Sequence, residues 1–278
     1  MIVNHAPLIS RLNELPRIQK VLQELLDMVN QDNVDFKRLA EKLAMDQVLS
    51  ARLLRMANSA YFGGNRTVTS VNEALIRVGT GPVKTLVVAS VLSSAFPHLE
   101  TLNMEEYWSD IFEVSVIASK IAACVKMDVD ETFTTGILHN IGELMIHALV
   151  PEQALVINSK VMNGQDAISA QEEILDVSSA ELGALLAKNW KFPKEMVDAI
   201  EHFPDPREAD ISPKLASIIH LAKDIHLNWD HFSSDDQKSV YLAEHTDSRL
   251  LNISATFKEV VDKFRGSGRE LANQMLAV

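Results

Sequence analysis

The chain has 278 residues, of which 47% are hydrophobic and 23% charged, ordinary values for a soluble globular protein. Its formal net charge of −12 argues against non-specific binding to nucleic acid or to an anionic membrane, because both need a basic protein surface. Aromatic residues make up only 6%, and 10 glycines and 9 prolines are few for this length, so helices are favoured over a sheet-rich sandwich or barrel.

The cysteine count and the hydropathy pattern bear on where the protein works. Cys124 is the single cysteine, so an intrachain disulfide cannot form, which fits a reducing compartment. It stands among apolar residues between Ile121 and Val125, and we expect a buried thiol. Neither a signal peptide nor an apolar run of membrane-spanning length is evident, so a cytoplasmic location is expected.

Helical periodicity with clear start and stop signals dominates the first hundred residues. It predicts helices over residues 16–29, 36–43, 48–57, 70–79 and 83–96. Asp46 is expected to cap the third helix, and Ser70 with Glu73 forms a capping box for the fourth. Gly79 supplies a positive φ at the end of that fourth helix. The fifth helix is apolar nearly all round, which predicts that it is buried.

A proline and a polar run over residues 97–103 predict a seam between two helical lobes. Beyond the seam, the same signals predict helices over residues 105–126, 130–149, 152–162, 167–175, 179–190, 194–202, 213–227, 235–244 and 248–264. A second capping box, Ser178 with Glu181, marks the start of the fifth of these. No strand with convincing alternation and no internal repeat is present in the sequence. The predicted fold class is all-α, a multi-helix bundle.

The stretch from Gly136 to Gly142, Gly-Ile-Leu-His-Asn-Ile-Gly, is the most informative part of the chain. Its apolar residues and two glycines predict a helix packed closely on its neighbours, with the imidazole of His139 facing inward. A histidine followed by an aspartate could give a metal both a nitrogen and an oxygen ligand. Here the second residue is Asn140, whose neutral carboxamide is a weak donor that cannot offset the charge of a dication.

Several sequence blocks together resemble the HDOD domain, a bacterial offshoot of the HD superfamily of all-helical, metal-dependent phosphohydrolases that is found in signalling and regulatory proteins. They are Leu15-Pro16, Asp46, residues 53–60 (Leu-Leu-Arg-Met-Ala-Asn-Ser-Ala), 74–79 and 107–108, the 136–142 motif, residues 182–186, Trp190 and Phe192-Pro193. The resemblance implies an N-terminal HDOD lobe over residues 1–100 and an HD-like lobe over 101–206. Residues 207–278 are then a C-terminal helical extension that packs on the HD-like lobe.

The resemblance also implies where metal ligands would lie, and several of them are missing. His139-Asn140 takes the place of the superfamily's His-Asp doublet, while Asp110 and Ser179 stand where related enzymes carry histidines. Neither a serine nor an asparagine replaces the lost ligands, because a dication needs about three anionic or imidazole donors. The remaining metal candidates are Asp110, His139 and His202.

Each histidine also has a structural interpretation. His139 can be a buried residue hydrogen-bonded to Glu143 one turn on, and His202 can interact with the dipole at a helix C-terminus. His220 and Asp224 share a helical face beyond the matched region, a possible ligand pair that is more often solvated or capping.

The first functional hypothesis is a non-catalytic HDOD signalling module that binds a partner protein or a small signalling ligand, with no cofactor and with neither nucleic acid nor membrane as partner. The second is a metal-dependent phosphohydrolase that uses Mn, Mg or Fe bound by Asp110, His139 and His202. A third is an oligomeric scaffold built on the C-terminal helices. The sequence leaves the oligomeric state open.

Overall fold

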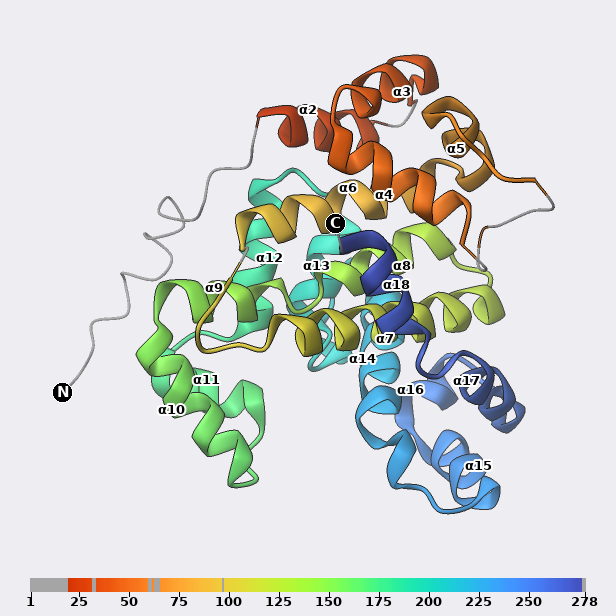
Figure 1. The fold of residues 1–278 in the computed structure, drawn as a ribbon. Coiled ribbons are helices and arrows are strands. Elements are labelled where there is room, and N and C mark those ends of the chain that lie inside the picture. Colours follow the sequence, from red (N-terminus) through yellow and green to blue (C-terminus); the bar gives the residue numbers. More distant parts are fainter. Residues whose placement is uncertain (1–19, 32–33, 60–61, 63–65, 97, 277–278) are drawn as a thin grey trace.

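The computed structural model describes residues 20–31, 34–59, 62, 66–96 and 98–276, and every regular element within these ranges is a helix (Figure 1). The predicted all-α class is therefore confirmed. Among the described residues, no single helix has the length and apolar character needed to cross a bilayer. Only α5 (Val71–Val78) and α6 (Thr80–Ala95) meet that requirement together, and they are bent by 112° at the break between them.

The N-terminal helices are α2 (Lys20–Val29), α3 (Phe36–Ala44), α4 (Gln47–Ala57) and α5. The last three begin at capping side chains. Asp46 accepts hydrogen bonds from the backbone N–H groups of Val48 and Leu49, both at 2.9 Å, as predicted. Ser70 caps α5, but Glu73 pairs with Arg66 at 3.5 Å instead of returning to the cap, so only half of the predicted capping box forms. The predicted helix start at Pro16 lies outside the described residues.

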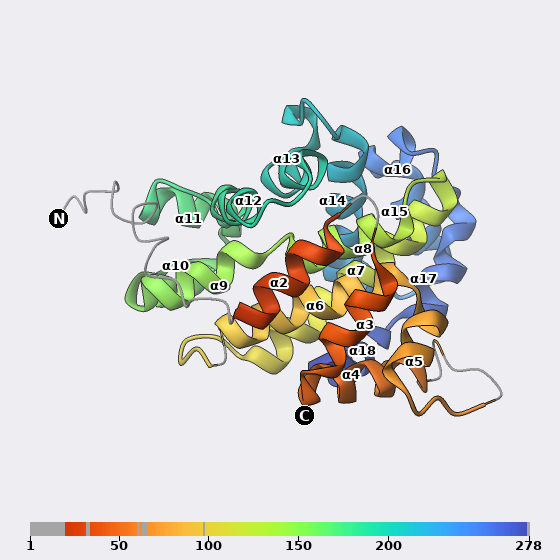
Figure 2. The same ribbon diagram turned by 90° about the horizontal axis from the view of Figure 1, so that it is seen from above.

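Helices α6 and α7 (Met104–Val125) lie in the middle of the molecule (Figures 1 and 2). The prediction that α6 is buried is confirmed, because ten of its sixteen residues are buried. Gly79, at the junction of α5 and α6, has the predicted positive φ of 82°. Helix α7 packs against α8, α14 and α18. Ile111 and Phe112 of α7 belong to the larger apolar core, whereas Val114 and Ile117 belong to a second core shared with the C-terminal helices.

The next helices surround the 136–142 motif. They are α8 (Val129–Leu138), α9 (Ile141–Leu149), α10 (Pro151–Met162), α11 (Ala167–Leu175), α12 (Ser179–Asn189) and α13 (Lys194–His202). The capping box of Ser178 and Glu181 at the start of α12 is confirmed. The single helix predicted over residues 130–149 is wrong, since the chain turns at His139 and Asn140 between α8 and α9.

The C-terminal part differs more from expectation. Its elements are α14 (Pro213–Asn228), α15 (Asp235–Glu244), α16 (Thr246–Leu250), α17 (Lys258–Phe264) and α18 (Ser267–Leu276), with short 3-10 turns at Pro206–Glu208, Trp229–His231 and Ala255–Phe257. The helix predicted over residues 248–264 is interrupted, because Asn252 adopts a left-handed φ of 55° that ends α16. Helix α18 was not predicted at all.

Helix α18 returns to the middle of the fold, where it packs on α4, α6 and α7 (Figure 1). The buried carboxylate of Glu113 in α7 accepts the backbone N–H groups of Gly266 and Gly268 at 2.8 and 2.7 Å and so caps the start of α18. At the other end, Arg52 donates to the carbonyl oxygen of Leu276 at 2.7 Å. The two ends of α18 are thus fastened to helices far away in the sequence.

Cys124 lies in the last turn of α7 and is exposed, so the predicted buried thiol is wrong. Ile121 and Ala122 in the same turn are buried, whereas Ala123 and Cys124 point away from the core. A helical turn always has two sides, and the apolar neighbours of Cys124 do not decide on which side it falls.

Candidate functional site

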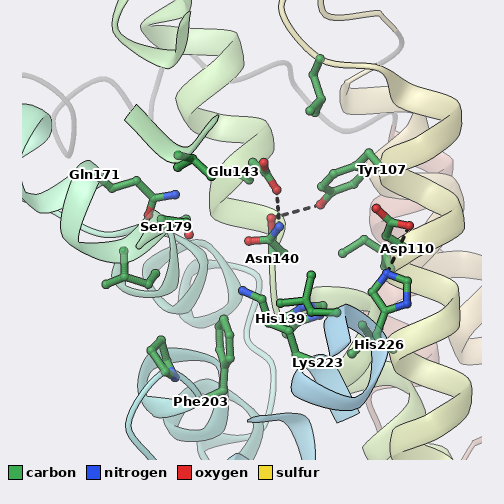
Figure 3. A pocket seen from close by; sticks show the side chains of 18 of the residues that line it. Tyr107, Asp110, His139, Asn140, Glu143, Gln171, Ser179, Phe203, Lys223 and His226 are labelled. Atoms are coloured by element: carbon green, nitrogen blue, oxygen red, sulfur yellow. Dashed lines mark hydrogen bonds and ion pairs between the residues drawn. The ribbon is translucent and has the colours of Figure 1, made fainter. Parts of the chain in front are cut away.

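A pocket of about 670 Å³ lies between α7, the α8–α9 corner, α12 and α14 (Figure 3). Asp110, His139, Asn140 and Ser179 all line it, so the structure brings these four positions to one cavity. His202 does not line the pocket. Its Nδ1 lies 3.0 Å from the carbonyl oxygen of Asp198 at the end of α13, which agrees with its interpretation as a histidine at a helix C-terminus.

The two glycines of the 136–142 motif allow the corner to reach the pocket. A Cβ on Gly136 would lie 2.8 Å from the Cα of Ser115 in α7, and one on Gly142 would lie 1.9 Å from the carbonyl oxygen of Ser179. Only glycine permits such approaches, so α8 lies against α7 and α9 against α12. The predicted close packing is confirmed. Its result is that the turn between α8 and α9 faces the cavity (Figure 3).

His139 is 2% exposed, and its Nδ1 lies 2.6 Å from the carbonyl oxygen of Gly136. A carbonyl can only accept, so Nδ1 carries the proton and Nε2 is an acceptor. Burial, and after it the positive charge of Lys223, lowers the pKa of His139 to about 3, which keeps the ring neutral. The predicted bond to Glu143 is wrong, because Glu143 is hydrogen-bonded to a different residue of the corner.

That residue is Asn140, whose side-chain amide donates to the carboxylate of Glu143 (Figure 3). The hydroxyl of Tyr107 donates to the backbone carbonyl of Asn140 at 3.1 Å. An aspartate at position 140 would instead place two carboxylates side by side. Burial raises the pKa of Glu143, so this carboxyl holds a proton more readily than an exposed one. Asn140 therefore has a structural use that an aspartate could not fulfil.

Asp110 is paired with a residue that the sequence did not suggest. Its Oδ1 lies 3.2 Å from Nε2 of His226 in α14. Arg265 donates to Nδ1 of the same ring at 2.9 Å, and since arginine has no acceptor, the proton of His226 is on Nε2 and points to Asp110. The carboxylate predicted as a metal ligand is thus engaged by an N–H group, with 52% of its side chain exposed.

Lys223 of α14 extends its ammonium group into the pocket (Figure 3). The Nζ atom lies 4.9 Å from the centre of the Phe203 ring, a cation–π contact. Burial lowers the pKa of Lys223, and the carboxylate of Glu143 opposes that shift. Lys223, His139 and Glu143 line the same pocket, and the ammonium adds to the lowering of the pKa of His139 and partly offsets the burial that raises the pKa of Glu143. The sequence analysis missed this residue.

These residues do not fit a dication at the His139-Asn140 corner. Among the described residues, only one group of three or more His, Cys, Asp or Glu side chains brings its ligand atoms within 4.8 Å of one another, and it consists of His220, Asp224 and His245. The candidate set of Asp110, His139 and His202 is therefore not assembled. The corner offers one free imidazole nitrogen and a neutral carboxamide beside a resident cation, too little for a divalent ion.

The chain is thus an all-helical bundle with a polar pocket at a histidine–asparagine corner. The sequence profile of the HDOD domain matches residues 15–206, and the protein belongs to the HDOD domain family. The resemblance noted from the sequence is confirmed, and with it the HD-like helical architecture.

Solved structures share this fold along nearly the whole chain. A candidate phosphohydrolase from Shewanella amazonensis SB2B is 36% identical, with a TM-score of 0.83 over 98% of this chain and 99% of that one. An HDOD domain protein of unknown function from Geobacter sulfurreducens is 19% identical, with a TM-score of 0.80 over 99% of both chains. A candidate signal transduction protein from Marinobacter aquaeolei VT8 is 20% identical, with a TM-score of 0.75 over 99% of this chain and 62% of that one.

One curated relative is longer than this chain. It is an uncharacterized protein of Treponema pallidum (strain Nichols), 23% identical over 221 residues, which are 78% of this chain. The match spans 43% of the relative's own length.

Proposed function

We propose that this protein is a non-catalytic HDOD signalling module that binds a small polar ligand in the pocket of Figure 3 and relays the bound state to a partner protein. The observation that carries the proposal is the position of Lys223, which lines the same pocket as His139 and Glu143. A metal-dependent hydrolase of this fold needs a dication at the same corner. A polar cavity of about 670 Å³ that lacks a set of metal ligands is suited to binding a small ligand.

The charge of Lys223 opposes the binding of a dication at the corner. At a separation of about 5 Å, an ammonium would repel a dication by about 7 kcal/mol at an effective dielectric constant of about 20. Asn140 removes the negative charge that would offset this repulsion. The polar groups that face the cavity, among them Gln171, Ser179 and Tyr107, offer a ligand several hydrogen-bonding positions.

The name of one solved neighbour supports signalling, and that of another supports hydrolysis. The Marinobacter protein is a candidate for signal transduction, whereas the more similar Shewanella protein is a candidate phosphohydrolase. The second candidate function is therefore a metal-dependent phosphohydrolase that uses Asp110 and His139. We expect either activity to be exercised in the cytoplasm, with neither nucleic acid nor membrane as partner, in keeping with the net charge of −12.

A hydrolysis assay separates the two functions. Purified protein is incubated with p-nitrophenyl phosphate and bis-p-nitrophenyl phosphate in the presence of Mn²⁺, Mg²⁺ or Fe²⁺, next to His139→Ala at equal concentration. The proposal predicts that both proteins give the same background rate with every metal. Metal-dependent turnover that is present in the wild type and lost in His139→Ala would establish the enzyme and refute the module.

A binding assay tests the pocket directly. Thermal shift with a panel of nucleoside monophosphates, nucleoside triphosphates and cyclic dinucleotides is expected to reveal at least one compound that stabilises the wild type. Lys223→Met should lose the shift, whereas Lys188→Met, a change at an exposed lysine of α12, should keep it. A panel without a single shift, or shifts that persist in Lys223→Met, would count against ligand binding at this pocket.

A further inference from the structure

His220 and Asp224 of α14 and His245 at the start of α16 converge on one point beside the pocket. The Oδ2 of Asp224 lies 3.0 Å from Nε2 of His245 and 3.8 Å from Nε2 of His220. We propose that these three side chains form a binding site for a first-row transition-metal dication, with Zn²⁺ as the ion they fit. This inference does not rest on the proposed function, since the site is separate from the His139-Asn140 corner.

The spacing of the ligand atoms is that of a small tetrahedral ion. Bonds of about 2.0–2.1 Å to nitrogen and oxygen place neighbouring ligand atoms of a tetrahedron about 3.3 Å apart. The two measured separations lie on either side of that value, and all three ligand atoms lie within 4.8 Å of one another. Two imidazoles and one carboxylate are a donor set that suits Zn²⁺ and leaves a fourth position for water.

Asp247 lies behind both imidazoles and holds that of His220. Its buried carboxylate Oδ2 lies 2.6 Å from Nδ1 of His220 and 3.9 Å from Nδ1 of His245. A carboxylate that accepts the Nδ1 proton fixes the ring so that an unprotonated Nε2 faces the metal, an arrangement common around metal-binding histidines. His220 already has this tautomer and orientation, because Nδ1 must donate to Asp247.

His245 has the other tautomer in the metal-free protein. Its Nδ1 accepts the backbone N–H of Asp247 at 3.2 Å as the N-cap of α16, and its Nε2 donates to Asp224. When an ion binds Nε2, the proton is released there and one is taken up at Nδ1, which a small rotation brings towards the Asp247 carboxylate. The ion therefore replaces one hydrogen bond and the cap, while two carboxylates offset its charge.

Access and charge decide whether an ion can reach this point. The side chains of His220 and Asp224 are 28% and 34% exposed and line the pocket, so an ion can enter from the cavity. The ammonium of Lys223 lines the same pocket and opposes binding, because it repels a cation. Asp224 and Asp247 offer two carboxylates against this single positive charge, which favours a dication at the three residues.

Calorimetric titration of the metal-free full-length chain with Zn²⁺ at pH 7.5 tests the site. One ion per chain is expected to bind to the wild type and to raise the Tm by roughly 5 °C near saturation. His245→Gln and Asp224→Asn should bind at least tenfold more weakly. His231→Gln, a change at an exposed histidine outside the group, should bind as the wild type does. Co²⁺ in the same site should give the visible absorption of a four-coordinate ion.

The alternative is that the three residues form only a hydrogen-bonded network. No saturable Zn²⁺ binding to the wild type, or equal binding to His245→Gln and Asp224→Asn, would overturn the proposal. Circular dichroism of each metal-free variant shows whether it is folded. If either of the two variants loses its helical signal, Asp247→Asn replaces it, and because that carboxylate lies behind the ligands, about tenfold weaker binding is expected there. Unchanged binding in Asp247→Asn would equally refute the site.

Discussion

Nε2 of His226 donates to the carboxylate of Asp110 at 3.2 Å, across the interface between α14 and α7. His226 lies beyond residues 15–206, the part of the chain that matches the HDOD family. Helix α14 thus supplies one wall of the pocket and engages the carboxylate that the sequence predicted as a metal ligand. The pocket therefore extends beyond the part of the chain that matches the family.

The Asp110–His226 pair should contribute modestly to stability. Because about half of the Asp110 side chain is exposed, solvent screens the interaction. A double-mutant cycle of Asp110→Ala, His226→Ala and the double variant should give a coupling energy of about 0.5 kcal/mol in urea unfolding at pH 7. The cycle cancels the loss of the Arg265 contact that His226→Ala also causes. Zero coupling would show that the pair is not formed in solution.

His139 should make the protein sensitive to acid. Its pKa is near 6.5 in the unfolded chain and about 3 in the folded one. Between these values the unfolded state binds the extra proton, so folding stability falls as the pH falls through that window. Full titration corresponds to about 1.4 kcal/mol per pH unit. His139→Gln removes this contribution, so the stability gap between wild type and variant should shrink by about that amount from pH 6 to pH 5.

Urea unfolding of both proteins at pH 7.5, 6 and 5 measures the gap. Glu143, whose raised pKa acts in the opposite direction, is present in both proteins and cancels in the difference. His98→Gln, a change at an exposed histidine, serves as the control and should follow the wild type at all three pH values. Parallel stability profiles for wild type and His139→Gln would show that the ring takes up a proton in the folded state.

Removal of the resident cation should make the corner more receptive to metal. His245→Gln first removes one ligand of the proposed zinc site at His220, Asp224 and His245. In that background, Asn140→Asp adds the carboxylate that the His139-Asn140 corner lacks at position 140. Adding Lys223→Gln should then tighten Mn²⁺ binding at least tenfold, or about 1.4 kcal/mol, because a nearby positive charge is gone. Lys188→Gln in place of Lys223→Gln should have no effect. Equal Mn²⁺ affinities with and without Lys223, including no binding in either case, would contradict this role of Lys223.

The cap on α18 should matter for the whole fold. Glu113 is 4% exposed and accepts two backbone N–H groups at the start of the helix. A glutamine at position 113 keeps one acceptor oxygen but turns an NH2 donor towards the other N–H group, so Glu113→Gln should lower the free energy of unfolding by about 2 kcal/mol. Glu172→Gln on the exposed face of α11 should change it by less than about 0.5 kcal/mol. A Glu113→Gln variant as stable as this control would show that the Glu113 cap does not stabilise the fold.

Much of the fold follows from local signals. Asp46, Gly79 and the capping box at Ser178 mark helix ends through chemistry that acts within one turn, and the structure has them as predicted. The break between α8 and α9 was missed because residues 136–142 have helical apolar spacing throughout. There the turn is imposed by the packing of Gly136 and Gly142 on other helices, which no local pattern records.

Only part of the site could be predicted from the sequence. The family resemblance located Asp110, His139 and Asn140, but the matching residues end before α14, which supplies Lys223 and His226. Lys223 resembles a solvated lysine when the sequence is read alone. One signal was available: Lys223 and Asp224 lie three and four residues after His220, so the three titratable side chains share one face of α14, whose other faces are mainly apolar. Such a stripe indicates that polar groups face a cavity, although it does not indicate which residues stand opposite.

The hydrogen bond from Arg52 to Leu276 joins residues 224 positions apart, so it can form only late in the synthesis of the chain. The apolar surface that α4 and α6 present to α18 stays bare until residues 267–276 have left the ribosome. At ordinary translation rates that delay is on the order of ten seconds. A nascent chain therefore exposes this apolar surface while the residues between α6 and α18 are being made, and a chaperone that binds apolar helices would recognise it there.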